Sequence, residues 1–199
     1  MYKVGITGGI GSGKSVVCEM LRQRDVAIYD CDIRAKELMA SDRVIAERLV
    51  ERFGAEVYAN GELNRGYLAE RVFSDAEALA ALNGIVHPRV AEDFERWASE
   101  AEGEYVVLES AILFESGFDS KVDVVVAIMA PEELRLERAM QRDGVSRELI
   151  EERMRNQLSD DERCHRAKYA IVNIELDELE EDVEQLHRRL SYDAKSFSH

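Results

Sequence analysis

Proline and cysteine are scarce in this chain, whose 199 residues include two prolines and three cysteines. Cys18, Cys31 and Cys164 lie far apart and form no Cys-x-x-Cys pair, so neither a disulfide framework nor a zinc site is predicted. Long apolar runs are lacking too, because the longest one, residues 124–130, is too short to span a bilayer. The first predicted strand begins at residue 2, which leaves no room for a signal peptide. A cytoplasmic location without membrane attachment is therefore expected.

Basic residues are outnumbered as well: 26 Lys and Arg stand against 41 Asp and Glu, which gives a net charge of −15. A surface that binds nucleic acid needs a broad basic face, so nucleic acid is not expected as a partner. A small anionic ligand is still compatible with this charge, since it needs only a few cations concentrated in one cleft. We therefore expect small-molecule substrates, and a chain that is a monomer or a weak homo-oligomer.

The most informative segment is glycine-rich. Residues 8–15 read Gly-Gly-Ile-Gly-Ser-Gly-Lys-Ser and match the G-x-x-x-x-G-K-[ST] pattern of a phosphate-binding P-loop. A buried-strand pattern at 2–7 precedes the segment and a helical pattern at 16–21 follows it, as this motif requires. Glycines let the backbone approach phosphate oxygens, and the helix N-terminus directs N–H groups toward the anion. Lys14 is expected to reach the β- and γ-phosphates of ATP, and the hydroxyl of Ser15 to bind Mg²⁺. A glycine-rich turn with an unrelated lysine is disfavoured.

Further strand and helix patterns alternate along the chain. This alternation predicts an α/β fold whose parallel sheet is covered on both faces. The predicted strands are residues 26–30, 105–109, 122–128 and 169–172, and the predicted helices include 33–39, 45–53, a helix that starts after Pro131, and 148–158.

Two other regions are predicted to be helical. Residues 54–102 keep a helical pattern, with a turn at 58–63 and a capping box at Ser74 and Glu77. This stretch is too long for a simple crossover, so we interpret it as a helical insertion. Near the C-terminus, leucine and valine residues recur at helical spacing over 176–190, which favours a helix docked on the sheet over a short coiled coil. Residues from 191 onward are expected to form a frayed tail.

Two carboxylates, Asp30 and Asp32, follow the second predicted strand. In open parallel sheets, ligands bind outside the carboxyl ends of the strands, which is also the edge where the P-loop lies. One carboxylate could accept a proton from an attacking hydroxyl while the other holds Mg²⁺ or its waters. The alternative is that an aspartate caps the N-terminus of the next helix, and both interpretations stay open. Glu109, at the end of another strand, is either a Mg²⁺-side carboxylate or a surface acid.

Three arginines, Arg135, Arg138 and Arg142, have the i, i+3, i+7 spacing of one helical face. Such a face suits a lid that closes over phosphates and supplies charge to the transferring group. A solvated face paired with nearby glutamates is an equally weighted alternative. The dipeptide at His87 and Pro88 is interpreted as a helix break in preference to a substrate contact.

Taken together, these pieces resemble the dephospho-coenzyme A kinase family, from Thr7 to Asn173. The P-loop alone is shared by many families, whereas the ordered set of motifs is specific. The set comprises residues 7–15, the Asp-x-Asp of 30–32, and residues 61–65, 82–88, 113–117 and 141–144, with Arg138, Arg153 and Gln157.

The resemblance implies a three-layer P-loop NTPase-like fold with a parallel sheet, a helical substrate-binding insertion and a lid. The implied boundaries are 1–53, 103–134 and 166–199 for the nucleotide-binding core, 54–102 for the substrate domain, and 135–165 for the lid. The implied activity is transfer of the γ-phosphate of ATP, with Mg²⁺, to the ribose 3′-hydroxyl of dephospho-coenzyme A. This is the last step of coenzyme A synthesis, a phosphotransfer to an alcohol.

By the same resemblance, roles are assigned to individual residues. Asp32 is the candidate base, and Lys14 and Arg138 complete the catalytic set. The implied ATP contacts are Gly9, Gly11, Ser12, Gly13, Lys14, Ser15, Val16 and Arg142. The implied substrate residues are Thr7, Asp30, Arg65 and His87, and the implied Mg²⁺ residues are Ser15 and Asp30.

The chain departs from the family pattern at three places. Val16 stands where the family usually has threonine, and Ala111 where it often has proline. After Asn173 the family commonly has a glycine-containing turn near the adenine, whereas residues 174–176 read Ile-Glu-Leu here, which puts a purine contact there in doubt. None of these changes removes a group that the chemistry needs.

Two other functions are weighed against this one. The first is a different small-molecule P-loop kinase, such as a nucleoside or nucleotide kinase. The second is a nucleotide-gated switch or binding module, but the chain lacks the Asn-Lys-x-Asp and Asp-x-x-Gly motifs usual in GTPase switches.

Overall fold

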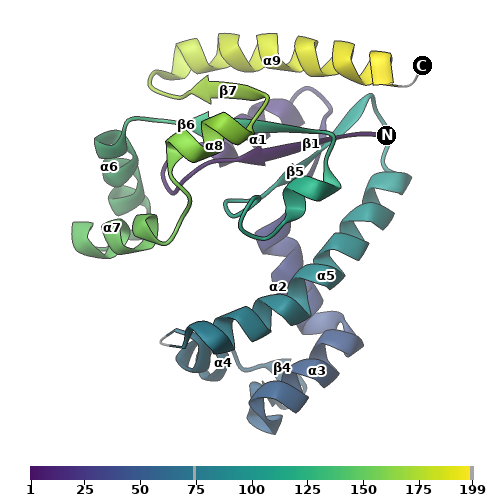
Figure 1. Cartoon of the computed structure of the whole chain (residues 1–199), viewed down its shortest axis with the longest axis vertical. Coiled ribbons are helices and arrows are strands. Elements are labelled where there is room, and N and C mark those ends of the chain that lie inside the picture. The colour runs from purple at the N-terminus through teal and green to yellow at the C-terminus, as the bar shows by residue number, and fades with distance from the viewer. Residues whose placement is uncertain (74, 198–199) are drawn as a thin grey trace. The chain divides into compact units, whose positions relative to one another are not determined.

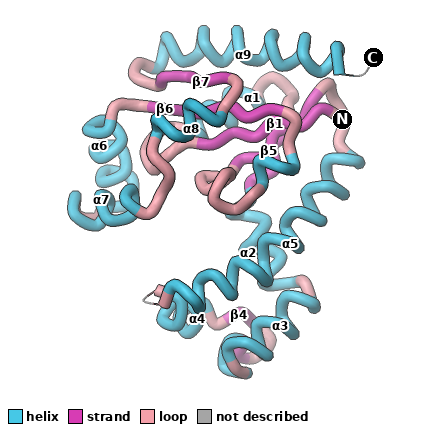
Figure 2. Tube along the Cα trace, viewed as in Figure 1, coloured by secondary structure: helices cyan, strands magenta, loops and turns pink. Residues whose placement is uncertain are grey.

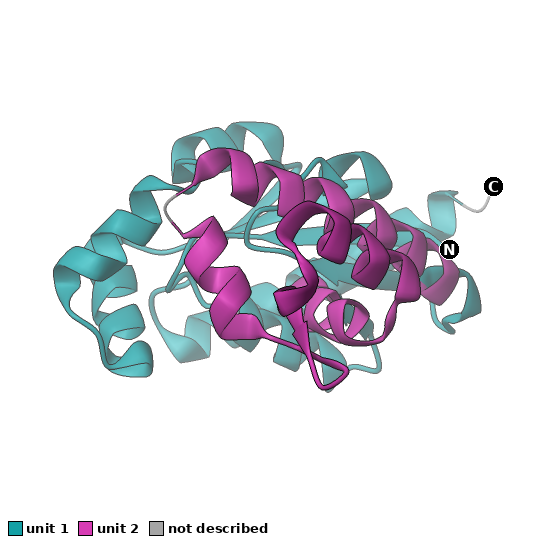
Figure 3. Cartoon of the chain, turned by 90° about the horizontal axis from the view of Figure 1, so that it is seen from below, with its two compact units in different colours: residues 1–29, 98–199 teal, residues 30–97 magenta. Residues whose placement is uncertain are grey.

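The computed structural model describes residues 1–73 and 75–197. The chain divides into two compact units, shown in Figure 3: unit 1 is Met1–Tyr29 with Ala98–His199, and unit 2 is Asp30–Trp97. Helices α2 (Cys31–Ser41) and α3 (Arg43–Phe53) fall in unit 2, although the helical insertion was expected to begin at residue 54. The functional division into core, substrate domain and lid stays a prediction.

Unit 1 is built on a five-stranded sheet with the order β2-β5-β1-β6-β7 (Figures 1 and 2). Strand β1 runs parallel to β5 and β6, and β6 runs parallel to β7, so the predicted parallel α/β sheet is confirmed. The register places Val4 of β1 opposite Val107 of β5 and Val124 of β6. The strands are β1 (Tyr2–Thr7), β2 (Ala27–Asp30), β5 (Tyr105–Glu109), β6 (Val124–Met129) and β7 (Tyr169–Val172).

Helices α1 (Lys14–Arg22) and α9 (Leu176–Phe197) supply the apolar side chains that pack on one face of this sheet. Val17 and Leu21 of α1 and Val183 and Leu190 of α9 are fully buried against strand residues such as Ile6. On the opposite face, Leu113 lies against Gly5 of β1, and α8 (Asp160–Arg166) packs beside β6. Helices α6 (Glu132–Asp143) and α7 (Arg147–Arg155) form a hairpin at one end of the sheet (Figure 1).

The expectation of a frayed tail from residue 191 is wrong, because α9 continues to Phe197. Asp193 accepts hydrogen bonds from Lys168 at 2.9 Å and from the hydroxyl of Tyr169 at 2.7 Å. The ring of Phe197 lies 5.3 Å from that of Tyr2, centroid to centroid. These contacts join the last turns of α9 to β1 and β7, and they are made by polar and aromatic side chains that helical apolar spacing does not reveal.

Unit 2 contains a hairpin of two short strands, β3 (Tyr58–Ala59) and β4 (Glu62–Leu63), preceded by the 3-10 turn Ala55–Val57. Its tight turn uses Asn60 and Gly61, which both adopt positive φ, at 54° and 83°. Asparagine and glycine tolerate this conformation best, so the predicted turn is confirmed. Helices α4 (Arg65–Val72) and α5 (Ala76–Glu100) follow, and α5 continues beyond the boundary of the unit.

The break expected at Pro88 is wrong, since Pro88 lies inside the continuous helix α5. Val86, Val90 and Phe94 have helical spacing and are buried, and their packing outweighs the one backbone hydrogen bond that proline cannot donate. The predicted cap residue Ser74 lies outside the described residues. The carboxylate of Asp75 accepts hydrogen bonds from two N–H groups of the first turn.

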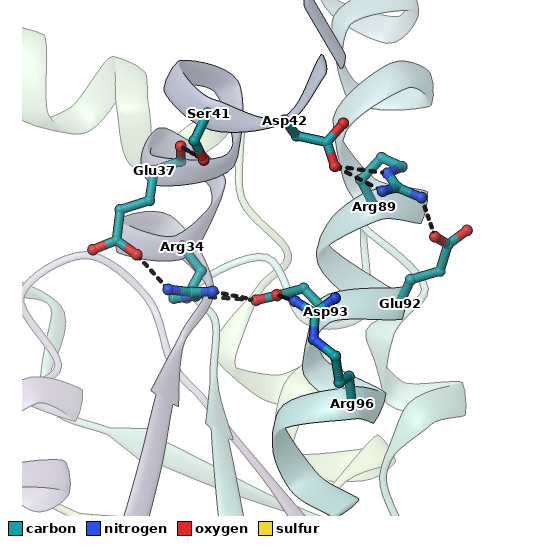
Figure 4. Close-up of polar contacts among 8 residues, drawn as sticks. All are labelled: Arg34, Glu37, Ser41, Asp42, Arg89, Glu92, Asp93 and Arg96. Atoms are coloured by element: carbon teal, nitrogen blue, oxygen red, sulfur yellow. Dashed lines mark hydrogen bonds and ion pairs between the residues drawn. The ribbon is translucent and has the colours of Figure 1, made fainter. Parts of the chain in front are cut away.

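Ion pairs tie the helices of unit 2 together (Figure 4). Asp93 on α5 is only 3% exposed. Its carboxylate accepts hydrogen bonds from Nε and Nη2 of Arg34 on α2 at 3.0 and 2.7 Å, and it also forms an ion pair with Arg96. Asp42, the N-cap of α3, receives two nitrogens of Arg89 on α5 at 3.0 and 2.7 Å. Both carboxylates bind arginines from another helix, so they fix how the helices of this unit pack.

Asp42 has two roles at once. Its carboxylate accepts hydrogen bonds from the N–H groups of Val44 and Ile45 while it pairs with Arg89. Burial alone would raise the pKa of Asp42, but the hydrogen bonds from Arg89 and the two N–H groups outweigh it and lower the pKa.

Among the described residues, no helix is both long and apolar enough to serve as a membrane span.

We expect Asp42→Asn to lower the free energy of unfolding by removing the ion pair, since asparagine still caps a helix. Asp42→Ala loses the cap as well and should cost about 1 kcal/mol more. Because the folded pKa is depressed, this stability is present above the unfolded value of about 3.9 and is lost as pH falls through the folded pKa. Urea titrations of the three proteins from pH 7 to pH 3 measure this. An unchanged pH dependence in Asp42→Asn would contradict the assignment.

Candidate active site

The P-loop joins β1 to α1 as the sequence predicted. Helix α1 begins at Lys14, and Gly13 precedes it with φ at 91°. Within the loop, Ser12 donates its N–H to the carbonyl of Gly9 at 3.1 Å. The first N–H groups of an α-helix have no partner within the helix, so the start of α1 presents donors to an anion. The geometry therefore fits the terminal phosphates of a nucleotide.

The P-loop backbone is packed tightly against two neighbouring segments. A methyl group on Gly13 would collide with the side-chain amide of Asn173, and one on Gly11 would collide with the backbone carbonyl of Arg135. Gly11 also has a positive φ of 76°. Side chains are excluded at these two positions by space as well as by conformation. The glycines thus serve the packing behind the loop as well as the approach of a ligand.

Asn173 lies directly after β7 and is 4% exposed. Its N–H donates to the carbonyl of Met129 at 2.7 Å, and its side-chain Nδ2 donates to the carbonyl of Ser12 at 2.9 Å. One buried side chain therefore connects the end of β7 to the P-loop. This contact with the P-loop was not predicted, since a hydrogen bond across 161 positions leaves no local pattern in the sequence.

Arg138 binds the segment that follows β7. Its Nη1 donates to the carbonyl of Asn173 at 3.1 Å and its Nη2 to that of Ile174 at 3.0 Å. Beside it is a largely apolar hollow of about 140 Å³ lined by Gly13, Val16, Arg138, Asn173, Leu176 and Leu179. The hollow adjoins the start of α1, so it has the position and the chemistry to receive a flat, mostly apolar ring.

The three arginines expected on one helical face have three different environments. Arg135 is buried, and its Nε donates to the carbonyl of Ile10 in the P-loop at 3.0 Å. Arg138 binds the loop after β7, and Arg142 is exposed and pairs with Asp143 at 2.7 Å. Arg135 therefore does not belong to an exposed cationic face, contrary to both sequence interpretations of the trio. Hydrogen bonding to Asp143 raises the pKa of Arg142 and lowers that of Asp143.

Two hydroxyl groups at the P-loop are buried without a hydrogen-bond partner among the described residues, those of Thr7 and Ser12. Buried hydroxyls usually have a hydrogen-bond partner, so these two are available to hydrogen-bond a bound ligand. Ser15, in the first turn of α1, is exposed. Glu109 is half-buried at the end of β5, which keeps both of its interpretations open.

A magnesium ion bound with a nucleotide needs few protein ligands, because phosphates and water supply the rest. Within residues 1–73 and 75–197, no cluster of three or more His, Cys, Asp or Glu could hold a metal by itself. A serine hydroxyl in the first turn after a P-loop is an oxygen ligand that Mg²⁺ uses in such sites. Ser15 thus fits the ion by its chemistry.

In unit 2, Asp30 is the last residue of β2 and the N-cap of α2. Its Oδ1 accepts the N–H of Ile33 at 2.9 Å, which confirms the capping alternative for this residue. Asp32 lies in the first turn of α2 and is exposed. The cap leaves the second oxygen of Asp30 and both oxygens of Asp32 to be considered for chemistry.

The two other predicted substrate residues also lie in unit 2. Arg65 is the first residue of α4 and is exposed. His87 is half-buried within α5, and burial lowers the pKa of its imidazole below the usual value of 6.5. His87 is therefore neutral near pH 7 and can act there as a hydrogen-bonding group. The roles of both residues stay predictions.

Comparison with known proteins gives a consistent picture. The family model described as dephospho-CoA kinase matches residues 2–178. The chain is 47% identical over 172 residues to the dephospho-CoA kinase of Bacteroides fragilis, covering 86% of this chain and 84% of that protein.

Solved structures agree with this result. A crystal structure of a Thermus thermophilus protein is 35% identical and has a TM-score of 0.83, covering 96% of this chain and 97% of that one. The dephospho-CoA kinase of Campylobacter jejuni, at 24% identity and a TM-score of 0.70 over 96% and 98% of the two chains, shares the fold. The P-loop geometry, the parallel sheet and these similarities lead to one conclusion: the chain belongs to the dephospho-CoA kinase family.

Proposed function

We propose that this protein transfers the γ-phosphate of ATP to the ribose 3′-hydroxyl of dephospho-coenzyme A and releases coenzyme A and ADP. The observation that carries the proposal is the P-loop of residues 8–15, which is held by Asn173 and Arg135 and followed directly by α1. Family membership supplies the acceptor. A P-loop alone would support only nucleotide binding.

On the nucleotide side, the N–H groups at the start of α1 and the ammonium of Lys14 bind the β- and γ-phosphates. We place the adenine in the hollow beside Arg138, where Leu176 and Val16 offer apolar contact. A purine contact there is part of the proposal, although the Ile-Glu-Leu sequence after Asn173 departs from the family pattern. Ser15 would hold Mg²⁺, which neutralises phosphate charge in such kinases, and the Mg²⁺ role of Asp30 stays a prediction from the family resemblance. Arg142 is proposed to release Asp143 and to bind the phosphates instead.

On the acceptor side, Asp32 takes the proton of the 3′-hydroxyl as that oxygen forms a bond to the γ-phosphorus. The bond between this phosphorus and the oxygen bridging to the β-phosphate breaks, and ADP leaves with the electron pair. Arg65 and His87 are proposed to bind the remainder of dephospho-coenzyme A. The reaction depends on positioning and charge neutralisation, for which the fixed donors of the P-loop are suited.

The cytoplasmic location and the monomeric or weakly associated state also stay predictions.

The proposal is tested by measuring ADP release from Mg·ATP with and without dephospho-coenzyme A. Strong stimulation by dephospho-coenzyme A is expected, because the acceptor hydroxyl is the missing reactant. Adenosine and AMP serve as control acceptors. Stimulation by one of these instead would keep the phosphotransfer and change the substrate. If no acceptor stimulates release while ATP still binds, the protein is a nucleotide-binding module and the proposal fails.

We expect Gly11→Ala to weaken binding of Mg·ADP by about tenfold or more, because the added methyl group displaces the loop from the backbone of Arg135. Gly144→Ala is the matched control. Gly144 has a similar positive φ of 66°, but nothing lies within 4 Å of an added methyl group. Both variants should lose about 1–2 kcal/mol of stability from backbone strain. Calorimetric titration with Mg·ADP distinguishes them, and equal affinities in the two variants would argue against close packing at Gly11.

Asp32→Asn should reduce kcat by roughly 10²–10⁴-fold while ATP binding changes little, because it removes the proton acceptor and leaves the P-loop intact. Asp30→Asn is the comparison, since asparagine preserves the cap on α2. That variant should mainly raise the Mg²⁺ concentration needed for half-maximal rate. The opposite pattern, with kcat lost in Asp30→Asn and retained in Asp32→Asn, would transfer the base role to Asp30.

A further inference from the structure

Arg135 occupies an unusual place for a charged residue. It lies in the first turn of α6 and is only 7% exposed. Its Nε donates to the carbonyl of Ile10 at 3.0 Å, and its Nη1 donates to Asp160 at 2.5 Å. A methyl group on Gly9 would collide with its guanidinium. The guanidinium therefore lies directly behind the tip of the P-loop.

The tip of the P-loop is held from two sides. While Arg135 binds the carbonyl of Ile10, the N–H of Ile10 donates to Oε1 of Gln157 at 2.9 Å. The side chain of Ile10 packs against the apolar cluster that joins α6 and α7, which includes Leu136 and Ile150. Both backbone groups and the side chain of Ile10 are thus fixed by residues from the 135–165 segment.

A chain of charged side chains continues behind Arg135, in which the two arginines are buried and Asp160 and Glu115 are partly exposed. Asp160 also accepts Nη1 of Arg163 at 3.1 Å, and Glu115 lies 3.6 Å from Nη2 of Arg163. Arg163 is fully buried, and burial lowers its pKa while Glu115 and Asp160 oppose that effect. Glu115 in turn accepts the N–H of Leu158 at 2.9 Å. Two arginines and two carboxylates balance one another, so removing a carboxylate would leave a buried arginine without its counter-charge.

From this arrangement we propose that Arg135 is a positioning residue that holds the P-loop in its nucleotide-binding shape, and that Asp160 orients Arg135 for this role. Arg135 acts through the backbone of Ile10, because its Nε and Nη1 are committed to Ile10 and Asp160. Preorganised donors need no rearrangement when the phosphates arrive, and the charge chain supplies that preorganisation. The proposal rests on the proposed kinase function for its turnover readout, but its nucleotide-binding readout does not.

The test compares wild type with Arg135→Met, Arg135→Lys and Asp160→Asn. We expect Arg135→Met to raise the Kd for Mg·ADP and the KM for ATP about tenfold or more, while the KM for dephospho-coenzyme A stays within about twofold. Asp160→Asn should raise the same two constants less. Arg135→Lys should recover part of the affinity, since a lysine keeps the charge opposite Asp160 and one donor.

The matched control is Arg24→Met. Arg24 also donates one nitrogen to a carbonyl, that of Met20 at 2.7 Å, and its Nε to a carboxylate, Glu184 at 2.9 Å, but it joins α1 to α9. This variant should lose stability and keep the KM for ATP and the Kd for Mg·ADP. A merely structural role for Arg135 would lower the maximal rate in proportion to the unfolded fraction and leave both constants unchanged.

Gln157→Ala provides a second route if Arg135→Met does not fold. It removes the acceptor of the Ile10 N–H without disturbing the charge chain, and it should also raise the Kd for Mg·ADP. Unchanged Mg·ADP affinity in folded Arg135→Lys, Asp160→Asn and Gln157→Ala would overturn the proposal. If wild type binds Mg·ADP but does not use dephospho-coenzyme A, the proposed function fails, while the affinity comparison still decides the role of Arg135.

Discussion

Close packing behind the P-loop is the constraint on which the nucleotide site depends. The loop forms its phosphate-facing side from backbone groups, and backbone alone cannot keep a long glycine-rich turn in one shape. Asn173 and Arg135 provide the missing rigidity by binding the carbonyls of Ser12 and Ile10. These two residues come from the end of β7 and from α6, so the site is complete only when distant parts of unit 1 are assembled.

This arrangement also explains how an acidic protein accommodates an anionic ligand. The net charge is −15, and several arginines of unit 1 are already neutralised by carboxylates, including Arg135 and Arg163 by Asp160. In the proposed function, the field that binds phosphate would therefore come mainly from oriented N–H groups and Lys14 at the start of α1. Such a field is local, so acidic residues elsewhere on the surface do not cancel it.

Local patterns were sufficient to predict much of the fold. Apolar segments predicted the five sheet strands, and the spacing of glycines predicted the P-loop, whereas α1 begins two residues before the predicted start of its helical pattern at residue 16. Helix α8 was missed because its sequence, Asp160–Arg166, is polar and lacks apolar periodicity, even though Arg163 within it is buried. The helix through Pro88 and the last turns of α9 were also missed, since packing stabilises both where local signals favour an end.

The candidate site divides in the same way. Lys14, Ser15 and Asp30 were predicted from motif and position, and their roles stay predictions, whereas the alternative of a cap on α2 by Asp30 is confirmed. The contacts of Arg135 and Asn173 were not, because each joins segments more than 120 residues apart. Helical spacing placed Arg135 with Arg138 and Arg142, but spacing does not specify what lies opposite each side chain.

The order of the units along the chain has a consequence for synthesis on the ribosome. Unit 2 is one continuous segment, whereas unit 1 combines the first 29 residues with residues 98 onward. β1 and the P-loop are translated before unit 2, whereas Arg135, Asn173 and α9 are translated after it. We therefore expect the inserted helices to fold while the strand that precedes them is still waiting for its neighbours. The nascent chain would then acquire the ability to bind nucleotide only after Arg135 and Asn173 have been translated.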